Sequence, residues 1–270
     1  MTVKQVIMSK KLFSVLFAML TAFGASAQDI DDDGASDEQS GVSFYVGADI
    51  SSAYVWRGVI SYKGANFQPC LEFDAGNFAL GLWNCNDFAG NLKELDIYAS
   101  YTVADQLTFT LTDYYSKDEN STDPVAPYGN YYAHETGHTF EFSMDWESNF
   151  GLDASMNLLF YGADKKWWLE GTDDEDKMNK NAYGTYFELG YTADVKGVAF
   201  RPCVGAVFNQ STWYGDESGS HKGFNVVNIA VKGSRDIKIT DRFSLPLYVS
   251  FGYNPQANDV WAFAGVTIGL

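Results

Sequence analysis

The stretch Val260-Trp-Ala-Phe-Ala-Gly-Val-Thr-Ile-Gly-Leu270 alternates apolar residues with small or polar ones. Segments of roughly ten residues with the same alternation recur back to Val42. Successive side chains of a β-strand point to opposite faces, so a period of two gives each strand one apolar and one polar face. Repeated strands of this kind are typical of a transmembrane β-barrel, whose outer face meets lipid and whose inner face meets the lumen.

The spacing of these segments predicts about 12 strands, joined by tight turns that alternate with longer loops. The predicted strands cover residues 42–54, 66–75, 78–88, 94–104, 107–116, 138–148, 151–163, 182–194, 198–210, 224–238, 243–254 and 260–270. Bacterial outer-membrane barrels have short periplasmic turns, longer outer loops and an even number of strands, which places both termini in the periplasm. The sequence therefore predicts an all-β, up-and-down antiparallel barrel over residues 41–270; a soluble β-sandwich is the alternative.

The N-terminal segment has the features of a cleaved signal peptide. Three lysines precede the short apolar run 12–24, and Ala25-Ser-Ala27 fits the small-x-small cleavage pattern. We expect residues 1–27 to be removed and residues 28–40 to form an acidic periplasmic tail. Asp29-x-Asp-x-Asp-Gly34 imitates the start of an EF-hand loop, but its twelfth position is Ser40 instead of Glu, so a solvated linker is favoured.

The composition excludes several classes of protein. No run of about 18 apolar residues follows the N-terminal segment, so no membrane-spanning helix is expected. The formal net charge of -17 does not suit nucleic acid, which is bound by Lys and Arg. Cys70, Cys85 and Cys203 fall within predicted strands and lack the spacing of a metal site. We interpret them as small buried side chains, leave a disulfide open, and expect no cofactor.

One face of the predicted strands carries the apolar residues that should meet lipid. These are Phe44, Val46, Ala48, Ile50, Leu95, Ile97, Ala99, Tyr101, Leu107, Phe109, Leu111, Phe142, Met144, Trp146, Leu152, Ala154, Met156, Leu158, Phe160, Phe187, Leu189, Tyr191, Leu245, Leu247, Val249, Phe251, Ala264, Val266, Ile268 and Leu270. Aromatic residues gather near the strand ends, as the interfacial girdles of such barrels require.

The opposite face carries the charged residues, because charges cannot face lipid cheaply. The predicted lumen residues are Asp49, Glu72, Asp74, Glu94, Asp96, Glu141, Asp145, Glu147, Asp153 and Glu188, with Arg57, Arg201 and Lys232. An excess of carboxylates in a narrow channel concentrates cations. The alternative is a lumen filled by side chains in which the three basic residues pair with carboxylates, since twelve strands enclose less space than larger porins do.

His134-Glu-Thr-Gly-His138 has the spacing of a zinc-protease motif, but its context is wrong. That motif needs a helix, whereas Gly129 and Gly137 disfavour one and residues 139–146 alternate as a strand. A membrane-embedded hydrolase would need a Ser-His constellation that we do not find. We therefore expect no metal site and no enzyme.

The stretch Gly47-Ala-Asp-Ile-Ser-Ser-Ala-Tyr-Val-Trp-Arg-Gly58 resembles the opening of the TorF-type porins, a family of bacterial outer-membrane barrels. Their first strand runs into Ser-x-x-Tyr-Val-aromatic-Arg-Gly, which residues 51–58 match. Gln68-Pro69 and residues 77–83 are similar to the second and third strands of that family. The resemblance implies an outer-membrane, channel-like protein of Gram-negative bacteria and carries over no substrate or catalytic residue.

These observations predict a passive outer-membrane channel for small solutes that prefers cations. The alternative is a non-conducting structural barrel whose loops 117–137, 164–181 and 211–223 bind partners at the surface. Arg57 is expected either at a constriction or in an ion pair with a wall carboxylate. Expected partners are small solutes, outer-membrane lipids, lipopolysaccharide and the barrel-assembly machinery. The acidic run 173–176 either bridges to lipopolysaccharide through divalent ions or is simply solvated.

Overall fold

The computed structural model describes residues 41–118, 125–133, 135–165, 180–209, 213–214, 223–240 and 243–269. The expected signal peptide, the acidic tail, His134, the acidic run 173–176 and Leu270 lie outside these residues, as do most of the loops 164–181 and 211–223. No helix of the described residues is long and apolar enough to cross a membrane.

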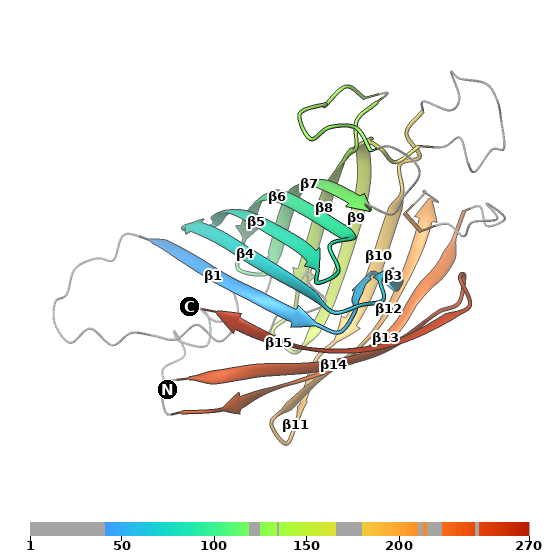
Figure 1. Ribbon diagram of the computed structural model, residues 1–270. Coiled ribbons are helices and arrows are strands. Elements are labelled where there is room, and N and C mark those ends of the chain that lie inside the picture. The colour runs from blue at the N-terminus through green and yellow to red at the C-terminus, as the bar shows by residue number, and fades with distance from the viewer. Residues whose placement is uncertain are drawn as a thin grey trace.

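The described chain forms a closed antiparallel β-barrel, which confirms the predicted fold class (Figure 1). The wall consists of β1 (Val42–Ser51), β4 (Asn66–Ala75), β5 (Phe78–Asp87), β6 (Leu92–Val103), β7 (Leu107–Asp118), β8 (His138–Glu147), β9 (Leu152–Gly162), β10 (Thr185–Tyr191), β11 (Ala193–Val195), β12 (Val198–Asn209), β13 (Asn225–Lys238), β14 (Ser244–Asn254) and β15 (Asp259–Gly269). Consecutive strands β10 and β11 both pair with β12, so these 13 elements make twelve wall strands.

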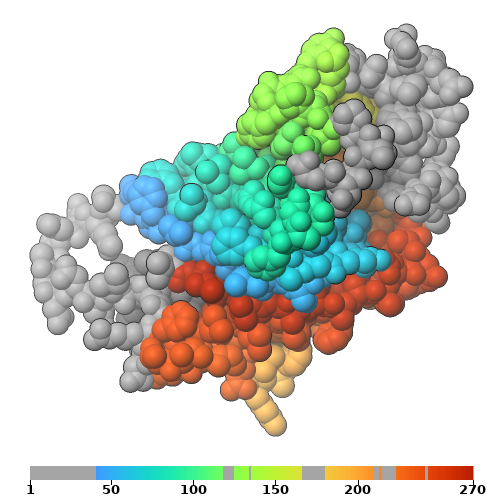
Figure 2. Space-filling view, viewed as in Figure 1, coloured from blue at the N-terminus to red at the C-terminus, as the bar shows by residue number. Residues whose placement is uncertain are grey.

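Two pairings close the sheet. Strand β10 pairs with both β9 and β12, and β1 pairs with both β4 and β15, so no wall strand is left as an edge. The seam between the first and last strands runs from Gly47↔Gly269 to Ser51↔Gly265. Figure 2 shows the blue surface of β1 bordering the red surface of β15. The closed ladder excludes the soluble sandwich, because a sandwich leaves two separate sheets.

The chain connections divide the barrel into two ends. The tight turns after β4, β6, β8, β11 and β13 lie at one end, here called the turn end. The longer connections lie at the other, here called the loop end. The start of β1 and the end of β15 belong to the turn end, as the predicted even number of strands requires.

The predicted first strand, 42–54, is wrong in one respect, because it stops at Ser51. Residues of the expected outer loop instead form a second small sheet, in which β2 (Tyr54–Trp56) pairs with β3 (Val59–Tyr62). All three residues of β2 are buried, so this hairpin folds into the barrel (Figure 1). Arg57 and Gly58 form its turn with positive φ angles of 50° and 82°. We call residues 54–62 the inner hairpin.

The two faces of the wall alternate as predicted. On β1, Phe44 is 74% exposed, whereas Tyr45 and Asp49 are buried. The same alternation of exposed apolar and buried polar side chains continues through β4, β6 and β14. A soluble fold buries its apolar face, so an apolar exterior around a polar interior is the arrangement of a barrel that sits in lipid.

Tyrosines on the inner wall cover glycines on neighbouring strands. A Cβ atom at Gly81 of β5 would overlap the ring of Tyr98 on β6, and one at Gly265 of β15 would overlap Tyr248 on β14. Each ring lies along the wall, and the Tyr98 hydroxyl donates a hydrogen bond to Glu72 at 2.5 Å. Glycine is needed at these positions because the aromatic ring occupies the space that a side chain would take.

Gly81→Ala should therefore destabilise the barrel by about 1–3 kcal/mol, because the new methyl group displaces the buried Tyr98 ring. The temperature at which the folded barrel loses its fast migration on a denaturing gel measures this effect. Gly129→Ala is the matched control, since nothing lies within 4 Å of the added atom. An equal midpoint for both variants would contradict the role of Tyr98.

Candidate functional site

The lumen contains every charged residue that the sequence analysis assigned to it. Asp49, Arg57, Glu72, Glu94, Asp96, Glu141, Asp145, Glu188 and Arg201 are each at most 8% exposed. Asp74, Glu147, Asp153 and Lys232 also face inward and are partly exposed.

Arg57 fixes the inner hairpin to the wall. Its Nη1 and Nη2 atoms donate to the two carboxylate oxygens of Glu141 on β8, at 2.5 Å and 2.8 Å. Nη2 also donates to Asn157 on β9 at 2.6 Å, and Nη1 donates to the Tyr214 hydroxyl at 2.8 Å. On the other side of the turn, Asn254 donates to the Gly58 carbonyl at 3.1 Å. We call Arg57, Glu141, Asn157 and Tyr214 the Arg57 cluster.

Charge is balanced inside this cluster. Burial by itself lowers the pKa of the Arg57 guanidinium, but Glu141 and Tyr214 outweigh burial and hold that pKa well above its ordinary value. Burial raises the pKa of Tyr214, although Arg57 opposes this effect. The cluster therefore consists of one cation, one anion and neutral hydrogen-bonding groups. Such a bidentate pair compensates for part of the cost of removing both charges from water.

Aromatic rings pack around the Arg57 cluster and fill the middle of the lumen. The Trp56 ring stacks on Tyr214 at 5.1 Å and lies 5.3 Å from Trp213. Tyr114 of β7 contacts the same group, and Tyr54 lies 5.5 Å from Trp83 on β5. The inner hairpin thus joins the wall through both ion pairing and apolar packing, and it narrows the lumen.

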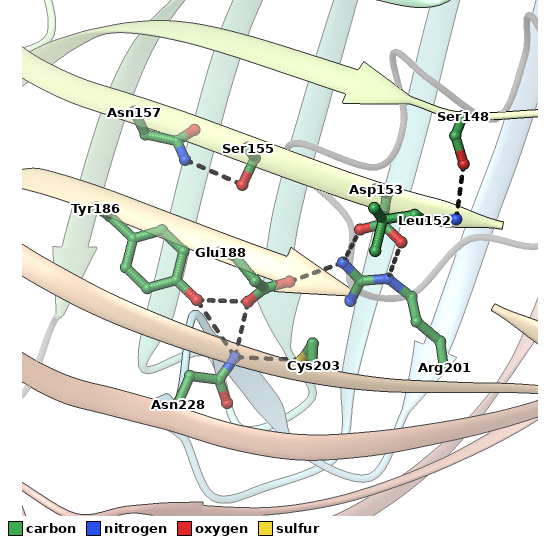
Figure 3. Close-up of polar contacts among 10 residues, drawn as sticks. All are labelled: Ser148, Leu152, Asp153, Ser155, Asn157, Tyr186, Glu188, Arg201, Cys203 and Asn228. Atoms are coloured by element: carbon green, nitrogen blue, oxygen red, sulfur yellow. Dashed lines mark hydrogen bonds and ion pairs between the residues drawn. The ribbon is translucent and has the colours of Figure 1, made fainter. Parts of the chain in front are cut away.

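Arg201 forms a second cluster between four wall strands (Figure 3). Its Nε donates to Asp153 of β9 at 3.2 Å, and Nη2 donates to the other Asp153 oxygen and to Glu188 of β10 at 2.9 Å. Glu188 also accepts hydrogen bonds from Asn228 of β13 at 2.9 Å and from Tyr186. These contacts tie β9, β10, β12 and β13 together across the inner face.

Lys232 lies beside Arg201 on the neighbouring strand and close to Asp49. Its Nζ atom is 4.7 Å from the centre of the Tyr248 ring, and the Tyr248 hydroxyl donates to Asp49 at 3.2 Å. Both wall cations of the lumen, Arg201 and Lys232, therefore belong to the adjacent strands β12 and β13.

Four buried carboxylates face the other side of the lumen without a basic partner. No Lys or Arg of the described residues forms an ion pair with Glu72, Glu94, Asp96 or Asp145. Asp96 Oδ1 and Asp145 Oδ2 also have no hydrogen-bond partner there. These residues come from β4, β6 and β8, and we call them the acidic wall. The basic residues Arg201 and Lys232 thus lie on one side of the lumen, and the acidic wall lies on the other.

Sequence reasoning missed several residues of these clusters. Trp213 and Tyr214 come from the connection between β12 and β13, where an aromatic pair looks like any surface loop. Asn157 had no charge to attract attention, although its place in the alternation put it on the inner face. Of the two roles expected for Arg57, the structure shows the ion pair with a wall carboxylate, that of Glu141.

His138 is the described histidine of the zinc-protease spacing at 134–138. Its Nδ1 lies 2.7 Å from Asp113 Oδ1, and its Nε2 lies 2.6 Å from the Tyr128 carbonyl. The ring also stacks on Tyr131 at 4.1 Å. Both nitrogens are thus engaged, and His138 holds the loop over the outer side of the wall. Among the described residues, no group of three or more His, Cys, Asp or Glu has an arrangement that could hold a metal ion.

Cys70, Cys85 and Cys203 are buried and free, which confirms their interpretation as small buried side chains. The disulfide that the sequence analysis left open does not form.

No protein-family model matches the chain. The chain is 23% identical over 227 residues to the proline–tRNA ligases of Bacillus cereus (strain G9842) and Bacillus mycoides (strain KBAB4). This match covers 79% of the chain, and the chain spans only 38% of the length of each ligase. An identity this low does not assign an activity, and the ligase likeness does not outweigh the closed barrel.

Among solved structures, the chain is similar to porins. The KdgM porin shares 10% identity and a TM-score of 0.45 over 83% of this chain and 97% of its own. The NanC porin shares 10% identity and a TM-score of 0.41 over 84% and 98%. Because both scores are below 0.5, the barrel assignment rests on the strand pairing described above. The strand pairing shows a closed antiparallel barrel, and the TorF-type resemblance is not confirmed.

Breaking the Arg57 cluster should test how the inner hairpin is held. Arg57→Met leaves the Glu141 carboxylate buried without a cation, which should cost about 3–5 kcal/mol of unfolding free energy. Adding Glu141→Gln should recover part of that loss, because the remaining charge is removed. Denaturant unfolding in micelles, followed by tryptophan fluorescence, gives the coupling energy of the cycle.

Arg235→Met is the control, because Arg235 is an exposed basic residue outside the lumen. If the effects of the two lumen substitutions simply add, the pair does not hold the hairpin.

Proposed function

We propose that the protein is an outer-membrane channel for the passive diffusion of small solutes, with a preference for cations. The observation that carries the preference is the acidic wall, in which four buried carboxylates lack a basic partner among the described residues. Carboxylates without a compensating charge in a narrow, poorly solvated passage attract cations and repel anions.

The location follows from the surface of the barrel. A closed ladder leaves no backbone group of the wall unpaired at an edge, and the exterior is apolar, so the barrel suits a bilayer. Under this proposal the loop end faces outward and the turn end faces the periplasm. Outer-membrane lipids and lipopolysaccharide would contact the exterior, and the barrel-assembly machinery would insert it after removal of residues 1–27.

The inner hairpin limits which solutes pass. Glu141 and Asp96 are only 1% and 2% exposed, so the middle of the lumen has little free space. Under this proposal, solutes pass between the inner hairpin and the wall, and only small solutes fit. The same burial favours the second candidate, a structural barrel that does not conduct.

Conductance across a planar bilayer separates these candidates. The wild-type protein should give discrete conductance steps, and its reversal potential in a salt gradient should show cation preference. Replacing two acidic side chains with Glu94→Gln and Asp96→Asn should lower the cation-to-anion permeability ratio at least about twofold, because the field of the acidic wall weakens.

Asp105→Asn with Asp194→Asn is the matched control, because both residues are exposed near turns outside the lumen. The absence of any conductance would favour the structural barrel. A permeability ratio that is unchanged by the lumen substitutions would remove the role of the acidic wall.

A further inference from the structure

A cavity of about 410 Å³ lies at the loop end of the lumen, between the inner hairpin and the beginning of β6. Four aromatic side chains line it, Tyr54, Trp56, Tyr62 and Trp213, and it contains the carboxylate of Glu94. The charged residues of the Arg57 and Arg201 clusters do not line it, although the Arg57 guanidinium lies 4.4 Å from the centre of the Trp56 ring. Its volume is within the range that small organic ligands occupy in proteins.

One acidic side chain, that of Glu94, lies at this cavity. Glu94 is 5% exposed, and its hydrogen-bond contact is the Tyr54 hydroxyl, at a long distance of 3.4 Å. No Lys or Arg is among the described residues that line the cavity. Two residues further along β6, the inward-facing Asp96 is 2% exposed and has an oxygen without a hydrogen-bond partner in the described chain. The cavity thus combines aromatic walls with an unpaired carboxylate.

We propose that this cavity binds an organic monocation of the alkylammonium or quaternary ammonium class. A cation with apolar substituents is attracted by aromatic rings within about 6 Å, and the attraction is larger where water is excluded. The same cation supplies the positive charge that Glu94 lacks. The inference deepens the proposed function, because it names a class of solute at the mouth of the channel.

Other ligands fit the cavity less well. An anion would face Glu94 with no Lys or Arg among the described residues that line the cavity. A small hydrated metal ion would gain little from four aromatic rings and would have to give up water. A neutral sugar could stack on the rings, but it would leave the buried carboxylate without a counter-charge.

Binding of choline to the full-length protein in detergent tests the proposal. Trp56 and Trp213 line the cavity, so tryptophan fluorescence should report the titration, and calorimetry should give the same Kd. The neutral isostere 3,3-dimethylbutan-1-ol has nearly the same shape without the charge. Choline should bind at least tenfold more tightly than this alcohol, and cellobiose should not compete with it.

Variants then locate the site. Glu94→Gln should weaken choline binding at least tenfold, whereas Glu94→Asp, which keeps the charge, should retain the preference for choline over the alcohol. Trp213→Leu should weaken binding of choline by removing one aromatic wall. Glu135→Gln is the matched control, since Glu135 is exposed on a loop away from the lining residues. Fast migration on a denaturing gel without heating verifies that each variant is folded.

Equal affinity for choline and the alcohol, or unchanged binding by Glu94→Gln, would overturn the proposal. Binding of cellobiose in place of choline would also overturn it and assign a neutral saccharide instead. Conductance is measured separately. Choline binding to a protein that does not conduct would reject the channel and leave this site standing, whereas conductance without choline binding would do the reverse.

Discussion

The closed ladder of backbone hydrogen bonds is the constraint on which the rest of the structure depends. In lipid no water is present to satisfy an exposed N–H or C=O group, so a sheet can span a bilayer only when its first and last strands pair. In this chain that pairing is the short seam between β1 and β15, from Gly47↔Gly269 to Ser51↔Gly265. Closure of the sheet creates an enclosed lumen. Charged side chains can be buried in this lumen, whereas an open sheet has no such space.

The interior is stabilised by contacts that cross it. Arg57 on the inner hairpin binds Glu141 and Asn157 on the wall, and Arg201 joins residues from β9 and β10. Buried charges are costly unless they are paired and hydrogen-bonded, and these two guanidinium groups meet both conditions. Tyrosine rings over inward-facing glycines fill much of the remaining space. The lumen is therefore organised as a packed polar core with a cavity of about 410 Å³ at the loop end.

Basic and acidic side chains lie on different sides of this core. The wall cations Arg201 and Lys232 belong to β12 and β13, whereas the buried carboxylates that have no basic partner among the described residues belong to β4, β6 and β8. The aromatic cavity lies on the acidic side, beside Glu94. A cation that entered at the loop end would thus meet aromatic rings and a carboxylate before it reached the narrow middle of the barrel. Selectivity and binding would thus involve the same acidic residue, Glu94.

The sequence by itself determined the wall. A period of two is a local property, so the strand 66–75 and the inward position of Asp49 could be predicted from neighbouring residues alone. The inner hairpin could not be predicted, because residues 54–56 are apolar and continue the pattern of the preceding strand. Only the closed barrel provides the enclosed space that buries all three. Likewise, the contact of Arg57 with Tyr214 joins residues 157 positions apart, and no local pattern encodes such a distance.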